Sequence, residues 1–594
     1  MLTRRTVLLS GAALAACATP PAAADQTEAF NAYHEAQFEA RLDRDPQFAT
    51  QLGDKRGYDR WTDPSAAGDA AESAALEAWV AGMKAQFDPA RLSADAQLTW
   101  RLAESALERD RAQRPWREHA YIFNQMFGAQ STLPVFLMNQ HRVDTVADAE
   151  AYVARLNGLK PHLEALTARS QDAARRGILP PRFVFDYVLA DCRNLLAGAP
   201  FAAGADAPLW ADAQRKIAAL DAPDAQKAQL AAAARAALTD SVQPAYLALI
   251  AALTAQQAQA SQDDGVWRLP DGEAYYAHQL AMMTTTAMSA REIHELGLAE
   301  VARIENEMRA LARQVNFAGD LPAFFRHVEG DPRHFLPNTP EGKAEYIVRA
   351  RAALDAMSAR LPDYFATLPR APLEVRAVEA FREQSAGLAF YQRPAQDGSR
   401  PGIYYANTQN MRGLPLYQLE ALAYHEGVPG HHMQLSIAQE SEGVPRFRRL
   451  APYTAYSEGW GLYCEGLAKD MGFYQDPYSD FGRLTLELRR AIRLVVDTGL
   501  HDKRWTRQQA IDYILATQPG EEDQARRDID RYIVMPGQAT AYKIGQLEIL
   551  RLREAARARL GARFDIRAFH DLVLRAGPMP LDMLRARVDA WSGA

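Results

Sequence analysis

Cysteine is scarce in this chain, which has three among its 594 residues: Cys17, Cys192 and Cys464. Exported proteins that depend on disulfide bonds carry many more cysteines for their size. A disulfide framework is therefore excluded. Cys192 and Cys464 are expected to be buried free thiols and not a bridged pair.

Basic residues are not in excess either. The 67 lysines and arginines are outnumbered by 74 aspartates and glutamates, and the formal net charge is −7. Because no basic run follows the N-terminus, neither nucleic-acid binding nor an anionic lipid surface is predicted. A continuous apolar run of about 18 residues, which a membrane-spanning helix needs, is also missing. Membrane contact is expected only through the N-terminus.

The N-terminal stretch "MLTRRTVLLSGAALAAC" has the pattern of an export signal. Its Arg-Arg pair resembles a twin-arginine signal, and its apolar segment, residues 6–16, is too short for a permanent membrane span. The ending Leu-Ala-Ala-Cys resembles a bacterial lipobox, in which Cys17 would be lipid-modified. The alternative is a soluble periplasmic protein cleaved after Ala24. We expect an exported, periplasmic, membrane-anchored lipoprotein whose export signal is residues 1–24.

Strand signals are rare. Alanine and leucine recur three and four residues apart through most of the chain, as in residues 289–315, which is typical of helices. The best strand is "RPGIYYANT", residues 400–408, which is aromatic and bounded by Pro-Gly. The expected fold is mainly α, with a small β element before the helix that carries His425. We expect a helical N-terminal part, residues 25–330, and a catalytic part, residues 331–594, in one integrated unit.

Residues 423–434, "AYHEGVPGHHMQ", resemble an interrupted zinc-hydrolase motif. The uninterrupted motif places two histidines four residues apart on one helix, with a glutamate after the first. His425 and Glu426 supply the first half, but Pro429 stands where the second histidine would be. Proline removes a backbone donor and disfavours helix at the preceding residue, so we expect a break and then a second helix.

This break is needed if a later histidine is to bind the same metal as His425. On a straight helix, His431 and His432 would lie about 9 and 10 Å along the axis from His425. Such a separation is too large because each ligand must lie about 2 Å from the zinc ion. The small Gly430 favours His431 as the second ligand, and His432 stays open as the alternative. The other histidine would support the ligands or face the substrate.

The third ligand is expected on a following helix, within "AYSEGWGLYCEGLAKDMG", residues 455–472. Glu458 stands between two small residues that permit close approach, and we predict that it binds the metal. Glu465 shares its helical face and is a candidate to support a ligand. Two imidazoles, one carboxylate and an open position suit Zn²⁺. The alternative is a kinked helix filled by polar residues without a metal.

Two C-terminal segments offer a donor for the oxyanion of a tetrahedral intermediate. "ATAYKIGQ" contains Tyr542, and "RLVVDTGLH" contains His501 with Asp497 four residues before it. Arg493, in the same helical segment as His501, is a candidate to bind a substrate carboxylate. For each of these residues the alternative is a structural hydrogen bond or, for the arginine, a solvated side chain.

Several motifs together resemble a bacterial family catalogued as domain of unknown function 885: "YHEGVPGHHMQ", "YSEGWGLYCEGL", "DGSRPGIYYANT", "VVDTGLHDKRWTRQQAIDYI" and "MPGQATAYKIGQLEI". That family looks like a distant relative of the gluzincin metallopeptidases, such as the helical carboxypeptidases and angiotensin-converting enzyme. The resemblance implies long helices around a deep cleft, one zinc ion and a glutamate as third ligand. It also implies that the strand before the zinc helix pairs with an extended peptide, with Tyr404, Tyr405 and Asn407 at the cleft. For the two tyrosines the alternative is a buried aromatic strand.

Together these expectations predict a zinc-dependent peptidase of the cell envelope that cleaves short peptides. His425, Glu458 and one of the paired histidines would hold Zn²⁺, and Glu426 would act as the general base. One alternative is an envelope lipoprotein that binds a peptide or a partner without catalysis. Another is a zinc hydrolase of a different amide or of an ester.

Overall fold

The fold is mainly α, as predicted. The computed structural model describes residues 25–593, except 380–382, 384–386, 396–397 and 399. Three short strands form one small sheet in this part of the chain. Cys192 and Cys464 are free and buried, which confirms their prediction. The expected lipid attachment at Cys17 lies outside the described residues.

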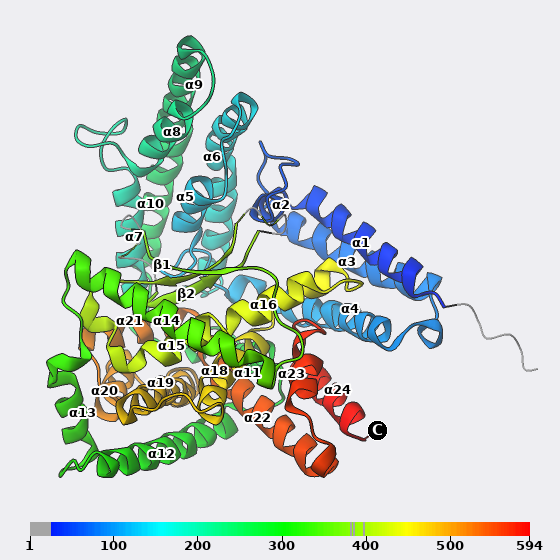
Figure 1. The fold of residues 1–594 in the computed structure, drawn as a ribbon. Helices are drawn as coiled ribbons and strands as arrows, with labels where there is room; N and C mark the ends of the chain where they lie inside the picture. Colours follow the sequence, from blue (N-terminus) through cyan, green and yellow to red (C-terminus); the bar gives the residue numbers. More distant parts are fainter. Residues whose placement is uncertain (1–24, 380–382, 384–386, 396–397, 399, 594) are drawn as a thin grey trace, which may run out of the picture.

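Helices and short turns alternate along the chain (Figure 1). The helices of the first part are α1 (Thr27–Arg44), α2 (Pro46–Gln51), α3 (Ala66–Gln86), α4 (Ala94–Gln113), α5 (Ala129–Asn139), α6 (Val146–Arg175), α7 (Arg182–Leu195), α8 (Pro208–Ala218), α9 (Asp224–Ala237), α10 (Gln243–Gln257), α11 (Gly272–Thr284), α12 (Ala290–Gln314) and α13 (Leu321–Gly330). Those that follow are α14 (Pro340–Tyr364), α15 (Leu419–Glu426), α16 (His431–Glu440), α17 (Arg446–Arg449), α18 (Thr454–Asp470), α19 (Pro477–His501), α20 (Arg507–Thr517), α21 (Glu522–Val534), α22 (Ala541–Leu560), α23 (Ile566–Leu574) and α24 (Leu581–Gly593). The sequence motifs that contain the candidate metal-binding and catalytic residues lie on this second group of helices.

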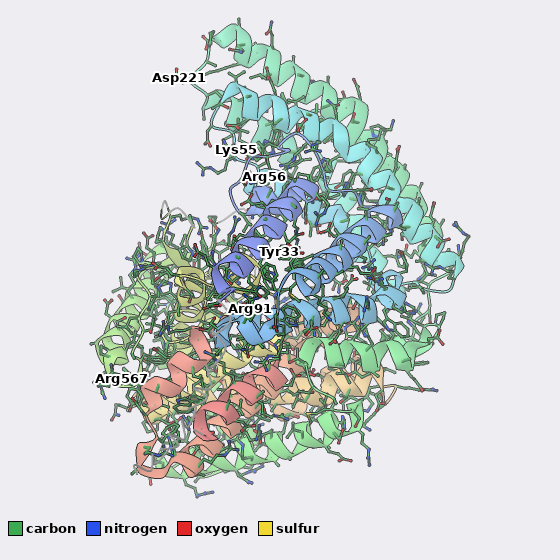
Figure 2. The ribbon with its side chains drawn as sticks, turned by 90° about the vertical axis from the view of Figure 1, so that its right-hand side faces the viewer. Tyr33, Lys55, Arg56, Arg91, Asp221 and Arg567 are labelled. Atoms are coloured by element: carbon green, nitrogen blue, oxygen red, sulfur yellow. The ribbon has the colours of Figure 1, made fainter. Side chains whose placement is uncertain are left out.

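An arm that contains α6 and α8–α10 extends from the rest of the molecule (Figure 1). Within it α10 packs along α6 and α7. Lys55 Nζ donates to Asp148 Oδ2 in the first turn of α6 over 2.8 Å, so the loop after α2 is tied to the arm. Figure 2 shows Asp221, between α8 and α9, near the tip of the arm and far from Arg567 on α23.

One helical stretch of the arm, Asp224–Gln257, is long and apolar enough to cross a membrane by length and composition alone. Polar residues interrupt its alanines and leucines, so the sequence shows no continuous apolar run there. In the structure Leu238, Val242 and Leu249 of this stretch are buried in the main hydrophobic core. Its central part therefore packs as a core helix within the arm.

The helix α19 is the centre of the part that carries the motifs, and nearly all of its residues are buried. It packs along α12 and also contacts α15, α18 and α22. Helices α18 and α22 approach so closely that a Cβ at Gly459 would lie 2.5 Å from the backbone of Gly545. The main core runs from Leu98 to Val588, on both sides of residue 330. This packing brings α15, α16, α18 and α19 around one point.

The small sheet lies beside that point and contains the predicted strand. Its strands are β1 (Leu373–Ala377), β2 (Ala389–Gln392) and β3 (Gly402–Ala406). The order is β1-β3-β2, with β3 parallel to β1 and antiparallel to β2. Because β3 has a neighbour on each side, it has no free edge for a peptide. The expectation that this strand pairs with an extended substrate is therefore corrected, and β2 is the edge strand next to it.

Candidate metal centre

The helix break predicted at Pro429 is present. Residues 427–430 form the turn between the end of α15 and the start of α16. A Cβ at Gly430 would lie 2.0 Å from the carbonyl oxygen of His425, a distance that only glycine avoids. This close approach folds the start of α16 back beside the end of α15.

The turn is held in place by α18. The indole Nε1 of Trp460 donates a hydrogen bond to the carbonyl oxygen of Pro429 over 2.9 Å, and Cys464 Sγ donates to the same oxygen over 3.3 Å. Both side chains are fully buried. The path of the turn therefore depends on a helix about thirty residues later in the chain.

His425, His431 and Glu458 converge at this turn. Nε2 of His425 lies 3.6 Å, and Nε2 of His431 lies 3.4 Å, from Oε2 of Glu458. One potential ligand atom from each residue lies within 4.8 Å of the other two. Two ligands at about 2.0–2.1 Å from a tetrahedral zinc ion are roughly 3.4 Å apart. The residues present therefore fit a zinc ion.

The orientation of His425 is fixed by a carboxylate behind it. Its Nδ1 donates to Glu465 Oε1 over 2.7 Å. Because a carboxylate only accepts, Nδ1 carries a ring hydrogen, which leaves Nε2, the nitrogen that faces Glu458, as the potential ligand atom. A Cβ at Gly461 would lie 2.7 Å from the His425 ring, so this glycine leaves room for the imidazole. Arg490 contacts the same oxygen of Glu465 over 3.4 Å.

His432 does not join the cluster. Its Nε2 donates to the carbonyl oxygen of Ala371 over 3.1 Å, and its Nδ1 accepts from the hydroxyl of Tyr391 over 2.9 Å. Burial lowers the pKa of His432 to about 4, so the ring is neutral at pH 7. Of the two alternatives left open by the sequence, the structure brings His431 to Glu458 and places His432 against the sheet.

Glu426 ends α15 beside the cluster. With His425, His431 and Glu458 it lines a cavity of about 500 Å³ between α15, α16, α18, α19, α21, α22 and β2. Burial raises the pKa of the Glu426 carboxyl. A carboxylate that lines the same cavity as three side chains that could hold a metal ion is suited to proton transfer.

The cavity also carries many positive charges. The arginines that line it are Arg393, Arg489, Arg490, Arg493 and Arg531. The Arg493 guanidinium lies 4.5 Å from the ring centroid of Tyr542, and its Nε donates to the Tyr532 hydroxyl over 3.0 Å. Tyr542 and Arg493, both selected from the sequence, therefore line the same cavity as Glu426.

His501 does not line this cavity. Its Nε2 donates to the carbonyl oxygen of Tyr532 over 3.0 Å, and its Nδ1 accepts from the backbone N–H of Val266 over 3.2 Å. Burial lowers its pKa to about 4. The ring thus joins α19 to neighbouring backbone, and the structure places it as a structural histidine and not as an oxyanion donor.

The predicted Asp497–His501 pair is not formed. Asp497 accepts from the Tyr276 hydroxyl over 2.7 Å and from the Gly537 N–H over 3.0 Å. Burial raises the pKa of Asp497 to about 7, although these hydrogen bonds oppose the shift. In the unfolded chain the pKa of an aspartate is about 3.9.

Asp497 is therefore expected to make the stability of the protein depend on pH. Between about pH 4 and 7 the folded protein holds a proton that the unfolded chain has released, so the free energy of unfolding falls as pH rises. Asp497→Asn should remove this dependence. The melting temperature of the variant minus that of the wild type should therefore be roughly 2 °C greater at pH 8 than at pH 5. Calorimetry of both proteins at the two pH values tests this, and parallel pH profiles would contradict it.

The three residues predicted around β3 do not line the cavity. Tyr404 is fully buried, and Tyr405 stacks on Phe390 with ring centroids 5.0 Å apart. Asn407 Nδ2 donates to the carbonyl oxygen of Glu383 over 2.8 Å. Residues on and beside β2 line the cavity in their place.

Sequence reasoning missed three contributors to the site: Trp460, Arg490 and the edge strand β2. A tryptophan between two glycines in a helical segment, "EGWGL", is a signal that a large side chain is anchored there. Arg490 and β2 gave no such signal, because one lies in an ordinary helical pattern and the other is only four residues long.

Comparison with known proteins places the chain in a family. No curated protein matches it. A structure described as the "putative lipoprotein" from Colwellia psychrerythraea is 29% identical, with a TM-score of 0.88 over 96% of this chain and 100% of its own. A second "putative lipoprotein", of unknown function, from Shewanella oneidensis is 19% identical and shares the fold, with a TM-score of 0.73 over 94% of this chain and 99% of its own. Residues 46–588 match the family described as "Bacterial protein of unknown function (DUF885)", and the chain belongs to that family.

Proposed function

We propose that this protein is a zinc-dependent peptidase of the cell envelope that cleaves short peptides. The observation that carries the proposal is the convergence of His425, His431 and Glu458 beside Glu426 in the wall of one cavity. A distant relationship to the gluzincin peptidases, suggested by the sequence motifs, is part of the same proposal.

His425, His431 and Glu458 would hold the zinc ion. Three protein ligands leave a fourth position open, which is the arrangement of catalytic zinc sites. The bound ion supplies Lewis acidity, which lowers the pKa of water and polarises a carbonyl group. The hydrogen bond from His425 to Glu465 would keep the first ligand in its orientation during turnover.

Glu426 would accept the proton of the attacking water and deliver it to the leaving amine. Its position directly after His425, on the wall of the cavity, gives its carboxylate access to a peptide bound there. Tyr542 would donate a hydrogen bond to the oxyanion that develops on the scissile carbonyl. His501 has no part in this scheme because both of its ring nitrogens bond to backbone.

An extended peptide would bind along β2. Ala389, Phe390 and Tyr391 of this strand line the cavity, and β2 is an edge of the described sheet. Main-chain hydrogen bonds to such an edge hold a peptide with little regard to its side chains. This edge takes the place that the sequence analysis gave to β3.

The envelope location rests on the N-terminal pattern. Export through the Arg-Arg signal and lipid attachment at Cys17 would leave the chain from Cys17 onward on the outer side of the membrane. The Colwellia psychrerythraea and Shewanella oneidensis proteins, both described as "putative lipoprotein", support this assignment.

Removal of the metal is expected to abolish peptide cleavage. The purified protein should contain one zinc ion per chain by elemental analysis, lose cleavage of a short-peptide library on chelation, and regain it with one equivalent of Zn²⁺. Peptide, ester and muropeptide libraries analysed in parallel by mass spectrometry identify the bond. Cleavage that survives zinc removal would contradict the proposal, and zinc binding without cleavage of any library would favour the non-catalytic alternative.

A further inference from the structure

The cavity holds positive charge that the proposed chemistry does not use. Arg490 and Arg493 are each 7% exposed. Nη1 of Arg493 and Nε of Arg490 are buried, and neither has a hydrogen-bond partner in the part of the chain that the structure describes. A buried charged group without a full set of partners is unfavourable in the folded protein, unless a ligand completes the set.

Arg493 is held in a fixed position in the cavity wall. Its Nε donates to the hydroxyl of Tyr532, and its guanidinium lies over the ring of Tyr542. The carboxylate of Asp528 also lines the cavity, but Arg489 donates to it twice, over 2.6 and 3.1 Å. Among the described residues, no carboxylate lies within salt-bridge distance of Arg493.

Arg490 connects this charge to the metal centre. Its Nη2 lies 3.4 Å from Oε1 of Glu465, the oxygen that accepts from His425. Its Nη1 donates to the backbone oxygen of Leu486 in its own helix. An anion bound at Arg490 and Arg493 would therefore share one cavity with Glu426 and the three metal-binding residues.

We propose that Arg493 and Arg490 form a subsite for a carboxylate of the substrate. The planar fork of arginine matches a carboxylate, and a donor already fixed in place loses little freedom on binding. The carboxylate comes from the C-terminus of a peptide or from an aspartate or glutamate side chain. A cavity of about 500 Å³ takes only a short ligand, so the bond cleaved lies near that carboxylate.

Binding of three matched probes tests the subsite: acetyl-trialanine with a free C-terminus, the same peptide as its amide, and acetyl-Ala-Ala-Glu as its amide. Calorimetric titration uses the full chain with Glu426→Gln, so that no probe is consumed. At least one carboxylate probe should bind 10-fold or more tightly than the trialanine amide. Arg493→Gln should abolish this preference, and Arg493→Lys, which keeps the charge but not the fork, should reduce it.

Arg531→Gln is the matched control, because it removes one positive charge from the same cavity and leaves Arg490 and Arg493 in place. It should keep the preference. A preference for the free acid identifies the C-terminal carboxylate, and a preference for the glutamate probe identifies a side chain. The subsite would be overturned if the parent protein bound all three probes with equal affinity. It would also be overturned if both Arg493 variants lowered the affinity for all three probes by the same factor.

The subsite rests on the proposed function only for the fate of the bound peptide. The titrations need no turnover and are repeated after chelation, so that a carboxylate bound by zinc is told apart from one bound by arginine. If the protein prefers the carboxylate probes both before and after chelation but cleaves no peptide, the peptidase proposal is overturned and the subsite is retained. Circular dichroism of each variant confirms that it is folded before its affinity is compared.

Discussion

Glutamine in place of Glu426 is expected to slow peptide cleavage by orders of magnitude while zinc stays bound. The side chain is not among the three that converge on one point, so its loss leaves the proposed set of metal ligands complete. A positioned general base contributes about 10²- to 10⁴-fold to the rate, and kcat should fall by that factor. Rates are measured on the peptide that the library identifies, together with the zinc content of the same sample.

Glu420→Gln is the matched control for this variant, since Glu420 lies on the same helix. Its carboxylate accepts from Tyr424 and Ser479 and does not line the cavity. Activity should survive in this control. Full activity of Glu426→Gln would assign the proton transfer to another group, and loss of zinc from it would show that Glu426 is a ligand.

Alanine in place of His431 is expected to release the zinc ion. Loss of a side chain that merely supports a ligand lowers metal affinity about 10- to 100-fold, and loss of a ligand should exceed that. Competition with a chelator of known affinity measures the change. His425→Ala and Glu458→Ala should behave in the same way, because the three donors form one set.

The neighbouring His432→Ala variant should keep one zinc ion per chain. It loses its hydrogen bonds to Ala371 and Tyr391, each worth about 1 kcal/mol, so it should be less stable than wild type. Thermal unfolding in the presence of chelator measures that loss without the contribution of the metal. Zinc loss from His432→Ala together with zinc retention in His431→Ala would reverse the assignment.

Much of the fold could be predicted because its signals are local. Three- and four-residue spacing of apolar side chains indicates helices, and a proline after His425 indicates a break. The short aromatic strand, residues 400–408, contains β3. The neighbours of β3 could not be predicted, because strand pairing depends on tertiary structure and has no local signal. That pairing places β3 between β1 and β2 and so decides which strands have a free edge.

The candidate site could be predicted except for the choice between two histidines as the second ligand. His425, Glu426 and Glu458 stand in patterns that indicate metal chemistry, and all three line the cavity. The choice between His431 and His432 depends on the path of a turn that Trp460 holds from another helix. Such a contact is set by tertiary packing and has no local signal.

The same limit explains the Asp497 and His501 prediction. Four-residue spacing places both side chains on one face of α19, but it does not show what lies opposite them. Tyr276 and the backbone of Gly537 bond to Asp497, and backbone groups bond to His501. Hydrogen-bond partners from distant segments, and not the spacing of Asp497 and His501 along the helix, decide which groups these two side chains contact.

The segment 458–465 of α18 makes the site sensitive to changes in chain length. It contributes the carboxylate of the candidate metal centre, the indole that holds the turn, the glycine that makes room for His425 and the carboxylate behind that ring. One inserted or deleted residue would rotate every later position by about 100°, so these contributions would no longer face the same way. Residues 427–430 accommodate a spacing between His425 and His431 that is two residues longer than in the uninterrupted motif. This turn is buried, and Trp460 and Cys464 both bond to Pro429 within it. Insertions and deletions are therefore expected to disrupt the site in the turn as well as in the helix that holds it.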